Sequence, residues 1–362
     1  MSEAPELERL PVSVITGFLG SGKTTLLKNL LQQADMADTA VVINEFGEIG
    51  LDHLLVEEAK EDTILMSSGC LCCSIRGDLI DTLRRLYKRR DRGEVPRFKR
   101  LVIETTGLAD PAPILQTLVG DPLLSAFYRL DGVVTTVDAV NGMDQLDRQF
   151  ESVKQAAVAD RLVLTKTDLV DTRQLAMLEA RLHALNPAAP LLPVAHGAVE
   201  AEQLFNAGLY NPAEKSPDVA RWLNEEAYAQ AASSHHHGHD HDHQHDDHDH
   251  DHALDVNRHD DHIRAFCLTC DRPIAWDRFV NWIEMLITMR GADLLRIKGI
   301  INVAGSDAPI AIHGIQHLFH PPAALPGWSG EDRRSRIVFI TRDLERAWLE
   351  QSMAEFLDEA SH

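Results

Sequence analysis

The segment GFLGSGKT, Gly17 to Thr24, constrains the fold of this chain more than any other stretch of its 362 residues. It matches the pattern G-x-x-x-x-G-K-[ST], follows the strand-like run VSVIT and precedes the helix-like run TTLLKNLLQQA. Glycines at this spacing let backbone N–H groups turn inward around phosphate oxygens, and the N-terminus of the following helix favours negative charge. The segment therefore predicts a phosphate-binding loop, because the strand and the helix disfavour an accidental glycine-rich turn.

Each part of this loop has an expected role. Lys23 is expected to contact the β- and γ-phosphates, and Thr24 to offer its hydroxyl to Mg²⁺, so both are predicted to act in catalysis as well as in binding. The nucleotide-binding residues expected here are Gly17, Gly20, Ser21, Gly22, Lys23, Thr24 and Thr25.

Short β-rich runs alternate with amphipathic helix-like stretches from residue 11 to about residue 195. The runs are VSVIT (12–16), AVVIN (40–44), TILMS (63–67), RLVIE (100–104), GVVTTV (132–137) and RLVLT (161–165). This alternation predicts an α/β fold of the P-loop NTPase type, a mostly parallel sheet with helices on both faces. From about residue 263 the pattern predicts a smaller α+β C-terminal domain.

Two strand ends bear on the choice of nucleotide. TKTD follows RLVLT, and Asp168 there can accept paired hydrogen bonds from the Watson–Crick edge of guanine, while Lys166 can cover the base. In IETTG, Glu104 is expected to hold the Mg²⁺ shell as a catalytic group, and Gly107 to sense the γ-phosphate. GTP is predicted, although either segment taken alone could be a polar turn. No glutamine is evident to orient the attacking water, which predicts slow intrinsic hydrolysis.

Three of the five cysteines, Cys70, Cys72 and Cys73, lie in GCLCCSI between TILMS and the helix-like GDLIDTLRRL. The chain has no export signal and no apolar stretch of ~20 residues, so we expect a cytoplasmic protein with reduced thiols and no membrane contact. Thiolates favour Zn²⁺ or Cu⁺ over Mg²⁺ or Ca²⁺. Two or three sulfurs completed by oxygen or nitrogen ligands are predicted; buried hydrophobes or a redox pair are the alternatives.

GFLGSGKTTLL, INEFGEIGLD, GCLCCSIRGDL, ETTGLADP and TKTD occur in the order seen in CobW-type P-loop GTPases, and the chain resembles that family of metallochaperones over nearly its whole length. The C-terminal unit, with LLRIKGIINV and IHGIQHLF, looks like the family's second domain. The resemblance implies that the three cysteines form the metal site. It also makes NEFGEIGLD the first switch region, with Glu45 and Glu48 as candidate ligands and Asp52 in the same segment. A solvated loop is the alternative for these carboxylates.

One position departs from the family's pattern. The base-recognition motif often opens with Asn, and this chain has Thr165, whereas Asp168 is retained. Thr165 is therefore expected to contact the nucleotide at the position that Asn often occupies, and to weaken nucleotide affinity without changing the choice of base.

The run HHHGHDHDHQHDDHDHDH, residues 235–252, separates the two predicted domains. Twelve of the nineteen histidines lie between His235 and His262, and nine aspartates against one arginine place eight of the 21 net negative charges in residues 240–261. Without apolar residues it is expected to be a disordered tether that binds several ions weakly, either as a metal store or as a solubilising spacer. The predicted organisation is residues 1–211 as GTPase domain, 212–262 as linker and 263–362 as C-terminal domain.

The C-terminal domain contains further thiols and imidazoles. Cys267 and Cys270 have the spacing of a zinc half-site, but residues three apart on a strand face opposite ways, so one packed or solvent-side thiol on each face is predicted. His313, His317 and His320 are expected to be structural residues rather than metal ligands.

Together these features predict a GTP-dependent metallochaperone that binds a transition metal, most of all Zn²⁺, beside the nucleotide and delivers it to an unidentified client protein. Co²⁺ delivery for cobalamin synthesis, and iron or nickel clients, stay open. The alternatives are a metal buffer or sensor with a regulatory GTPase domain, and a small-molecule kinase, which TKTD and the thiols disfavour. The net charge of −21 argues against nucleic-acid binding. The sequence does not determine the oligomeric state.

Overall fold

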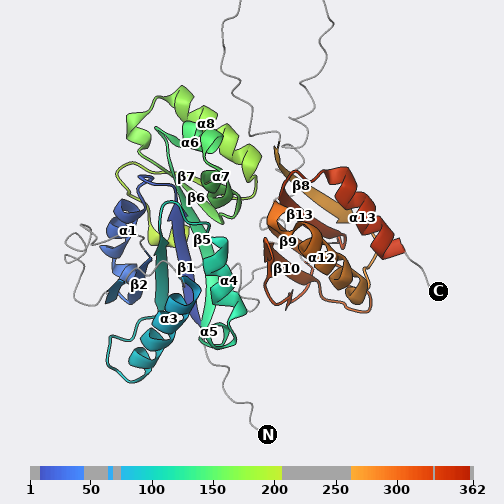
Figure 1. The fold of residues 1–362 in the computed structure, drawn as a ribbon, viewed down its shortest axis with the longest axis horizontal. Coiled ribbons are helices and arrows are strands. Elements are labelled where there is room, and N and C mark those ends of the chain that lie inside the picture. Colours follow the sequence, from blue (N-terminus) through green and yellow to red (C-terminus); the bar gives the residue numbers. More distant parts are fainter. Residues whose placement is uncertain (1–8, 45–63, 68–74, 206–261, 329–330, 359–362) are drawn as a thin grey trace, which may run out of the picture.

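The computed structural model describes residues 9–44, 64–67, 75–205, 262–328 and 331–358. Within these residues the chain forms two β-sheets (Figure 1), of which the first has seven parallel strands in the order β3-β2-β4-β1-β5-β6-β7. Its strands are β1 Leu10–Gly17, β2 Thr39–Asn44, β3 Ile64–Ser67, β4 Arg100–Thr105, β5 Tyr128–Asp138, β6 Arg161–Thr165 and β7 Leu191–Pro193.

Helices cover both faces of this sheet, because successive strand residues bury apolar side chains on opposite sides. Ile15 joins a core cluster with Leu26 of α1 and Leu204 of α9, whereas Val14 joins one with Leu83 of α3 and residues of α4 and α5. The helices are α1 Lys23–Leu31, α3 Ile75–Asp91, α4 Ala112–Gly120, α5 Pro122–Phe127, α6 Gly142–Arg148, α7 Phe150–Ala157, α8 Thr172–Leu185 and α9 Ala201–Leu204, with 3₁₀ turns η1 Ala34–Met36 and η2 Thr167–Leu169. The predicted parallel α/β fold is confirmed.

Each of the six predicted strands is present within a few residues of its expected position. The sequence pattern did not indicate β7, because the three-residue strand is bounded by Pro190 and ends at Pro193. This short strand matters for the site, since the loop that follows it lies beside the predicted base-recognition residues.

The second sheet has six strands in the part of the chain that the structure describes, with antiparallel pairing in the order β11-β10-β9-β13-β8 and β12 paired to β10. Helices α12 and α13 cover one face, where Trp282 is fully buried against Phe339. The predicted α+β C-terminal domain is confirmed. The structure also contains the strands β10 to β12, which the sequence pattern did not indicate. The elements are β8 Ile263–Cys270, α12 Trp276–Arg290, η4 Gly291–Asp293, β9 Leu294–Ile301, β10 Ile310–Ile315, β11 Leu318–Phe319, β12 Ala323–Ala324, β13 Ser335–Arg342 and α13 Arg346–Asp358.

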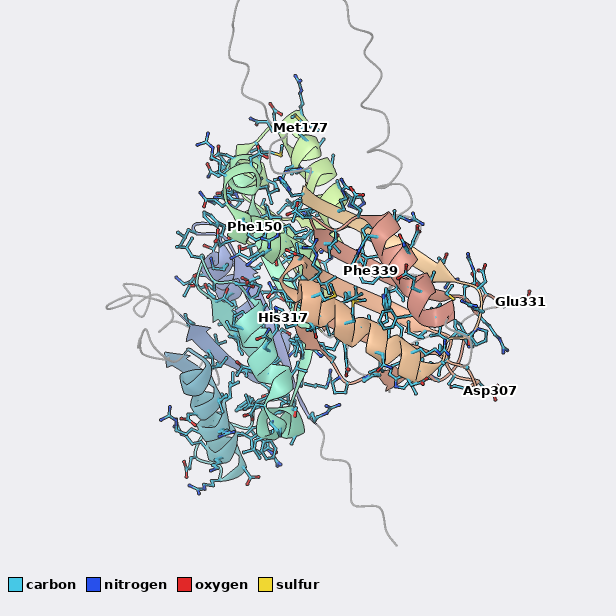
Figure 2. The ribbon with its side chains drawn as sticks, turned by 45° about the vertical axis from the view of Figure 1, so that its right-hand side comes forward. Phe150, Met177, Asp307, His317, Glu331 and Phe339 are labelled. Atoms are coloured by element: carbon cyan, nitrogen blue, oxygen red, sulfur yellow. The ribbon has the colours of Figure 1, made fainter. Side chains whose placement is uncertain are left out.

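The other face of the second sheet packs against the first domain. Ile300 and Val338 share one core cluster with Leu178 and Leu182 of α8 and with residues of α7. Figure 2 shows Phe150 of α7 at this border, where the guanidinium carbon of Arg342 lies 4.8 Å from its ring centroid. The two domains therefore share a core rather than only a covalent connection.

The predicted domain boundaries at 211 and 262 and the histidine tether stay predictions, because residues 206–261 lie outside the described residues. Among the helices that are described, none combines the length and the apolar character needed to cross a bilayer.

Candidate nucleotide and metal site

The predicted phosphate loop connects β1 to α1 through three glycines with positive φ. Gly17, Gly20 and Gly22 have φ values of 141°, 70° and 88°, which L side chains rarely adopt. A Cβ on Gly17 would lie 2.3 Å from Oγ1 and 2.4 Å from the carbonyl oxygen of Thr136, so a side chain does not fit there. The loop also contacts β5, because Ser21 Oγ hydrogen-bonds to Thr136 Oγ1 at 2.6 Å.

Lys23 begins α1 and is mostly buried, with 8% of its surface exposed. Its Nζ donates to the carbonyl oxygens of Gly17 (2.9 Å) and Phe18 (3.0 Å), so the ammonium group lies at the mouth of the loop. A cation held there by backbone dipoles is placed to contact phosphate oxygens.

Thr24 and Glu104 meet although they are 80 residues apart, since β1 and β4 are neighbours in the sheet. Thr24 Oγ1 donates to Glu104 Oε1 at 2.7 Å, and Glu104 is 5% exposed. A hydroxyl and a buried carboxylate form the oxygen donor set that Mg²⁺ prefers, so these two residues fit a magnesium ion.

Thr165 lies at the end of β6, directly behind the phosphate loop. Its Oγ1 donates to the carbonyl oxygens of Ser21 (2.8 Å) and Val137 (3.3 Å), which ties the phosphate loop to β6. A Cβ on Gly22 would lie 3.4 Å from Thr165 Cγ2, so the two segments are already in close contact. The short threonine side chain is therefore long enough to hold the phosphate loop against the end of β6.

Asp168 and Lys166 lie at the outer side of the same strand end. Lys166, with φ 58°, directs its Nζ to Asp138 Oδ2 at 2.6 Å. Burial disfavours the Asp138 carboxylate, but hydrogen bonds from Lys166, Asn141 and Val140 outweigh this effect and hold its pKa below the ordinary value. Asp138 is thus a fixed negative charge that orients the Lys166 side chain within the predicted base-recognition segment.

The loop after β7 also lies beside the predicted nucleotide-binding residues, which the sequence motifs did not indicate. His196 Nδ1 lies 3.8 Å from Asp168 Oδ2, and Asn29 Nδ2 donates to the His196 carbonyl oxygen at 2.6 Å. A Cβ on Gly197 (φ 74°) would lie 2.6 Å from Asn29 Nδ2 and 3.4 Å from Thr25, the exposed third residue of α1. The only sequence signal for this loop was the dipeptide His196-Gly197, which follows a short apolar run and indicates a turn at a strand end.

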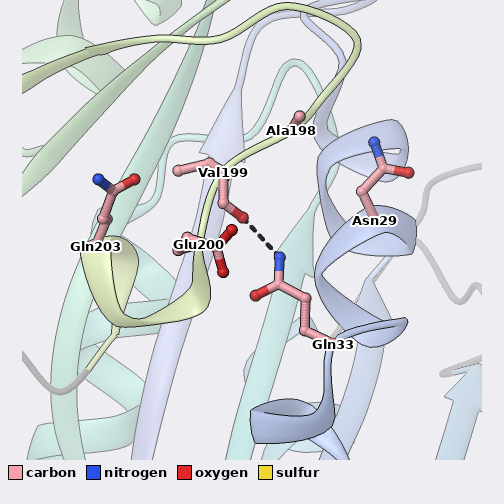
Figure 3. A pocket seen from close by; sticks show the side chains of 6 residues that line it. All are labelled: Asn29, Gln33, Ala198, Val199, Glu200 and Gln203. Atoms are coloured by element: carbon pink, nitrogen blue, oxygen red, sulfur yellow. Dashed lines mark hydrogen bonds between the residues drawn. The ribbon is translucent and has the colours of Figure 1, made fainter.

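A cavity of about 330 Å³ lies behind this loop and is a separate feature (Figure 3). Gln33 spans it, because its Nε2 donates to the Val199 carbonyl oxygen at 2.7 Å and its Oε1 accepts from the Ala201 N–H at 2.8 Å. None of the predicted site residues lines this cavity, which is lined by Asn29, Gln33, Ala198, Val199, Glu200 and Gln203.

Gly107 lies on the loop that follows β4 and packs against the phosphate loop. A Cβ on Gly107 would lie 2.7 Å from the backbone N and Cα atoms of Leu19, so only glycine allows this approach. Beneath it, Thr105 Oγ1 donates to Thr16 Oγ1 at 2.8 Å and joins β4 to β1. The structure therefore brings Gly107, Glu104, Lys23 and Thr24 to one edge of the sheet.

The predicted metal ligands Cys70, Cys72, Cys73, Glu45 and Glu48 lie outside the described residues, as does Asp52. The strands before them are described: β2 ends at Asn44 and β3 at Ser67, and they pair in parallel with Ile43 opposite Ser67. Both strands end at the same edge of the sheet as β4, which pairs with β2 up to Thr105.

The other thiols and imidazoles do not converge. Cys267 packs with the core shared by the two domains and Cys270 with the core under α12, so the expected thiol on each face is confirmed. The rings of His313 and His320 meet edge to face with centroids 5.1 Å apart, and burial lowers the pKa of His320 to about 4. Among the described residues, no three His, Cys, Asp or Glu side chains are arranged to hold a metal ion.

Two segments of the chain match known domains. Residues 11–193, just over half of the chain, match the CobW/HypB/UreG nucleotide-binding domain. Residues 263–357 match the cobalamin synthesis protein CobW C-terminal domain. The chain belongs to the CobW-type GTPase family. The resemblance expected from the motifs is thereby confirmed.

Relatives align with this CobW-type chain over nearly its full length. Escherichia coli K12 has a protein named zinc chaperone YjiA, 32% identical over 331 residues that cover 91% of this chain and 93% of that protein. A Schizosaccharomyces pombe protein named zinc-regulated GTPase metalloprotein activator 1 is 28% identical, with coverage of 94% and 84%. The crystal structure of Zn(II)-bound YjiA GTPase from E. coli superposes with a TM-score of 0.68 at 27% identity, covering 96% of this chain and 99% of that one. The chain is a P-loop GTPase.

Proposed function

We propose that this CobW-type GTPase is a zinc metallochaperone that binds Zn²⁺ through Cys70, Cys72 and Cys73 and delivers it to a client protein as GTP is hydrolysed. Glu45 and Glu48 are the proposed additional ligands. Full-length relatives that are named zinc chaperones support the choice of metal. Thiolates and carboxylates are also common zinc ligands in proteins.

The sheet topology is the observation that best supports coupling between metal and nucleotide. The cysteines follow β3, and β3 lies two strand spacings from β4, which ends with Glu104 and Thr105. Neighbouring strands are about 4.8 Å apart, so the thiol segment starts about 10 Å from the carboxylate that faces the phosphate loop. A segment this close can respond to the γ-phosphate through the switch residues between β2 and β3.

Thr24 and Glu104 are the residues that would hold Mg²⁺, and Lys23 would contact the β- and γ-phosphates. Bound Mg²⁺ supplies positive charge to the phosphate oxygens. Asp168, with Lys166 and the His196 loop around it, is the proposed guanine-recognition group. Thr165, Ser21 and the three loop glycines fix the position of the phosphates relative to the base.

A zinc titration with a competing chromophoric chelator tests the proposal. The chain lacking residues 235–252 is titrated with a non-hydrolysable GTP analogue and with GDP, beside the same chain with Cys72→Ser and Cys73→Ser. We expect one tight zinc site that is at least tenfold tighter with the GTP analogue, and its loss in the cysteine variant. By linkage, zinc must tighten binding of the GTP analogue relative to binding of GDP by the same factor.

Two outcomes would contradict the proposal. Equal zinc affinity in the two nucleotide states would leave a metal buffer with an uncoupled GTPase domain. Tight zinc binding that survives both serine substitutions would place the metal elsewhere in the chain.

A further inference from the structure

The loop between β4 and α4, residues 106–110, is held by both domains. On the first-domain side, Gln155 of α7 donates its Nε2 to the carbonyl oxygens of Gly107 (3.2 Å) and Ala109 (3.0 Å). Gln155 is 1% exposed, so these hydrogen bonds are shielded from water. These hydrogen bonds from α7 therefore hold in place the loop 106–110, which contacts the phosphate loop through Gly107.

Asp110 is the point where the C-terminal domain reaches this loop. Its Oδ1 accepts from the Ala112 N–H at 3.0 Å, at the start of α4. Its Oδ2 accepts from Lys154 Nζ at 2.9 Å and from Gln316 Nε2 at 3.3 Å. One carboxylate therefore joins the loop, α4, α7 and a residue 206 positions further along the chain.

Gln316 is held firmly enough to act on Asp110. It lies in the turn between β10 and β11 with φ 53°, and its N–H donates to the Leu294 carbonyl oxygen at 2.8 Å. On either side of it, Ile315 is fully buried in the core cluster of the first domain and Leu318 packs against the same cluster. Figure 2 shows the adjacent His317 at the border between the domains, whereas Asp307 and Glu331 lie at the far end of the C-terminal domain.

We propose that Gln316 is a positioning residue of the GTPase: through Asp110 it holds the Thr106–Asp110 loop against the phosphate loop, so that the C-terminal domain sets the rate of GTP hydrolysis. The chain of contacts is continuous from Gln316 to Asp110, from Asp110 along the loop to Gly107, and from Gly107 to Leu19. In the predicted site this loop lies beside the γ-phosphate and away from the base, so the effect should fall on turnover more than on GTP affinity. A protein that moves the β10–β11 hairpin would alter hydrolysis in the other domain.

Steady-state GTP hydrolysis of the full chain tests this assignment with two substitutions. Gln316→Ala removes the donor, and Gln316→Glu places a second carboxylate beside Asp110. We expect kcat to fall about threefold to tenfold in Gln316→Ala and further in Gln316→Glu, with KM for GTP within twofold of the original. His317→Gln is the matched control, because His317 is exposed in the same turn and packs on Gly291 rather than on the loop.

A swapped pair separates positioning from general damage. In the double variant Asp110→Asn with Gln316→Glu, the amide at position 110 can donate to the carboxylate at position 316, which restores the contact with its polarity reversed. Because Asp110→Asn also removes the ion pair with Lys154, the single variant Asp110→Asn is measured as the reference. We expect the double variant to have a kcat at least twofold above that of Asp110→Asn and of Gln316→Glu, at unchanged stoichiometry of GTP-analogue binding. The assignment is overturned if both single variants keep kcat within twofold, if His317→Gln loses as much, or if the swapped pair recovers nothing.

Discussion

Thr165 joins two segments that are predicted to face the nucleotide, the phosphate loop and the TKTD segment. Its hydroxyl donates to the Ser21 carbonyl oxygen at 2.8 Å inside a buried site, so one side chain ties the phosphate loop to the end of β6. The sequence predicted weaker nucleotide affinity from the threonine. The geometry explains how a short side chain still fastens the loop, because Gly22 lies almost in contact with it.

Thr165→Val should weaken binding of GDP about fivefold, because it removes a buried hydrogen bond worth about 1 kcal/mol and leaves the Ser21 carbonyl without this donor. Fluorescence titration with a labelled GDP measures the effect. Thr167→Val is the control, since the Thr167 hydroxyl makes no hydrogen bond within the described part of the chain and should change affinity less than twofold. Equal affinity of Thr165→Val and the original chain would contradict the fastening role.

At the scale of the element, the phosphate loop depends on glycine for two different reasons. Gly17 needs glycine because a side chain would overlap Thr136, whereas Gly20 has nothing within 4 Å of a Cβ and needs only its positive φ. Backbone strain of this kind costs about 1–2 kcal/mol, while a clash with a neighbouring strand adds to it.

We therefore expect Gly20→Ala to lower the free energy of unfolding by about 1 kcal/mol and Gly17→Ala by about 3 kcal/mol or more. Urea unfolding in the absence of nucleotide measures both values against the original chain. If the two variants unfold at the same urea concentration, the contact with Thr136 does not limit the loop.

At the scale of the whole molecule, a buried charge cluster joins the two domains. Asp160, between α7 and β6, accepts hydrogen bonds from the Val133 N–H (2.9 Å) and Arg296, and Lys298 Nζ lies 3.3 Å from it. Arg296 and Lys298 belong to β9, so one first-domain carboxylate meets two C-terminal cations at 5% exposure or less. Burial would raise the pKa of Asp160, but Arg296 and Lys298 outweigh it and lower this pKa to about 2.

Asp160→Asn should destabilise the chain by about 3–5 kcal/mol, because two buried cations lose their counter-charge. Lys298→Met should change stability by less than about 1 kcal/mol at pH 7, since Arg296 still pairs with Asp160. Urea unfolding followed by tryptophan fluorescence compares the two variants. Similar losses in both would mean that the cluster contributes through packing alone.

The same cluster predicts a pH dependence. Burial and the neighbouring Arg296 lower the pKa of Lys298 from 10.5 to about 7, although Asp160 opposes this shift. Between these two pH values the unfolded chain binds the proton that the folded chain has lost, so stability attributable to Lys298 rises with pH. The original chain should gain stability relative to Lys298→Met between pH 7 and about pH 9. A parallel pH profile in the two chains would show that Lys298 keeps its ordinary pKa.

Local sequence patterns determined much of this protein. The glycine spacing from Gly17 to Gly22 and the six apolar runs predicted the phosphate loop and the parallel sheet, because loop conformation and strand formation depend on residues close together in the chain, and alternating strands and helices favour parallel pairing. The strand ends also predicted that Glu104 and Thr165 lie near the loop, since parallel strands bring their carboxyl ends to one edge.

Tertiary structure decided the contacts between residues with no pattern of their own. Gln316 reaches Asp110 because the residues beside it, Ile315 and Leu318, pack in the first-domain core with α4. Asp160 meets Arg296 and Lys298 because an apolar face of the second sheet packs on α7 and α8. Neither pairing has a sequence signal, since hydrogen bonds and charges act over a few ångströms while the partners lie more than 130 residues apart. The sequence therefore indicated which residues are expected to bind the nucleotide, and the packing of the two domains determined which other residues hold those segments in place.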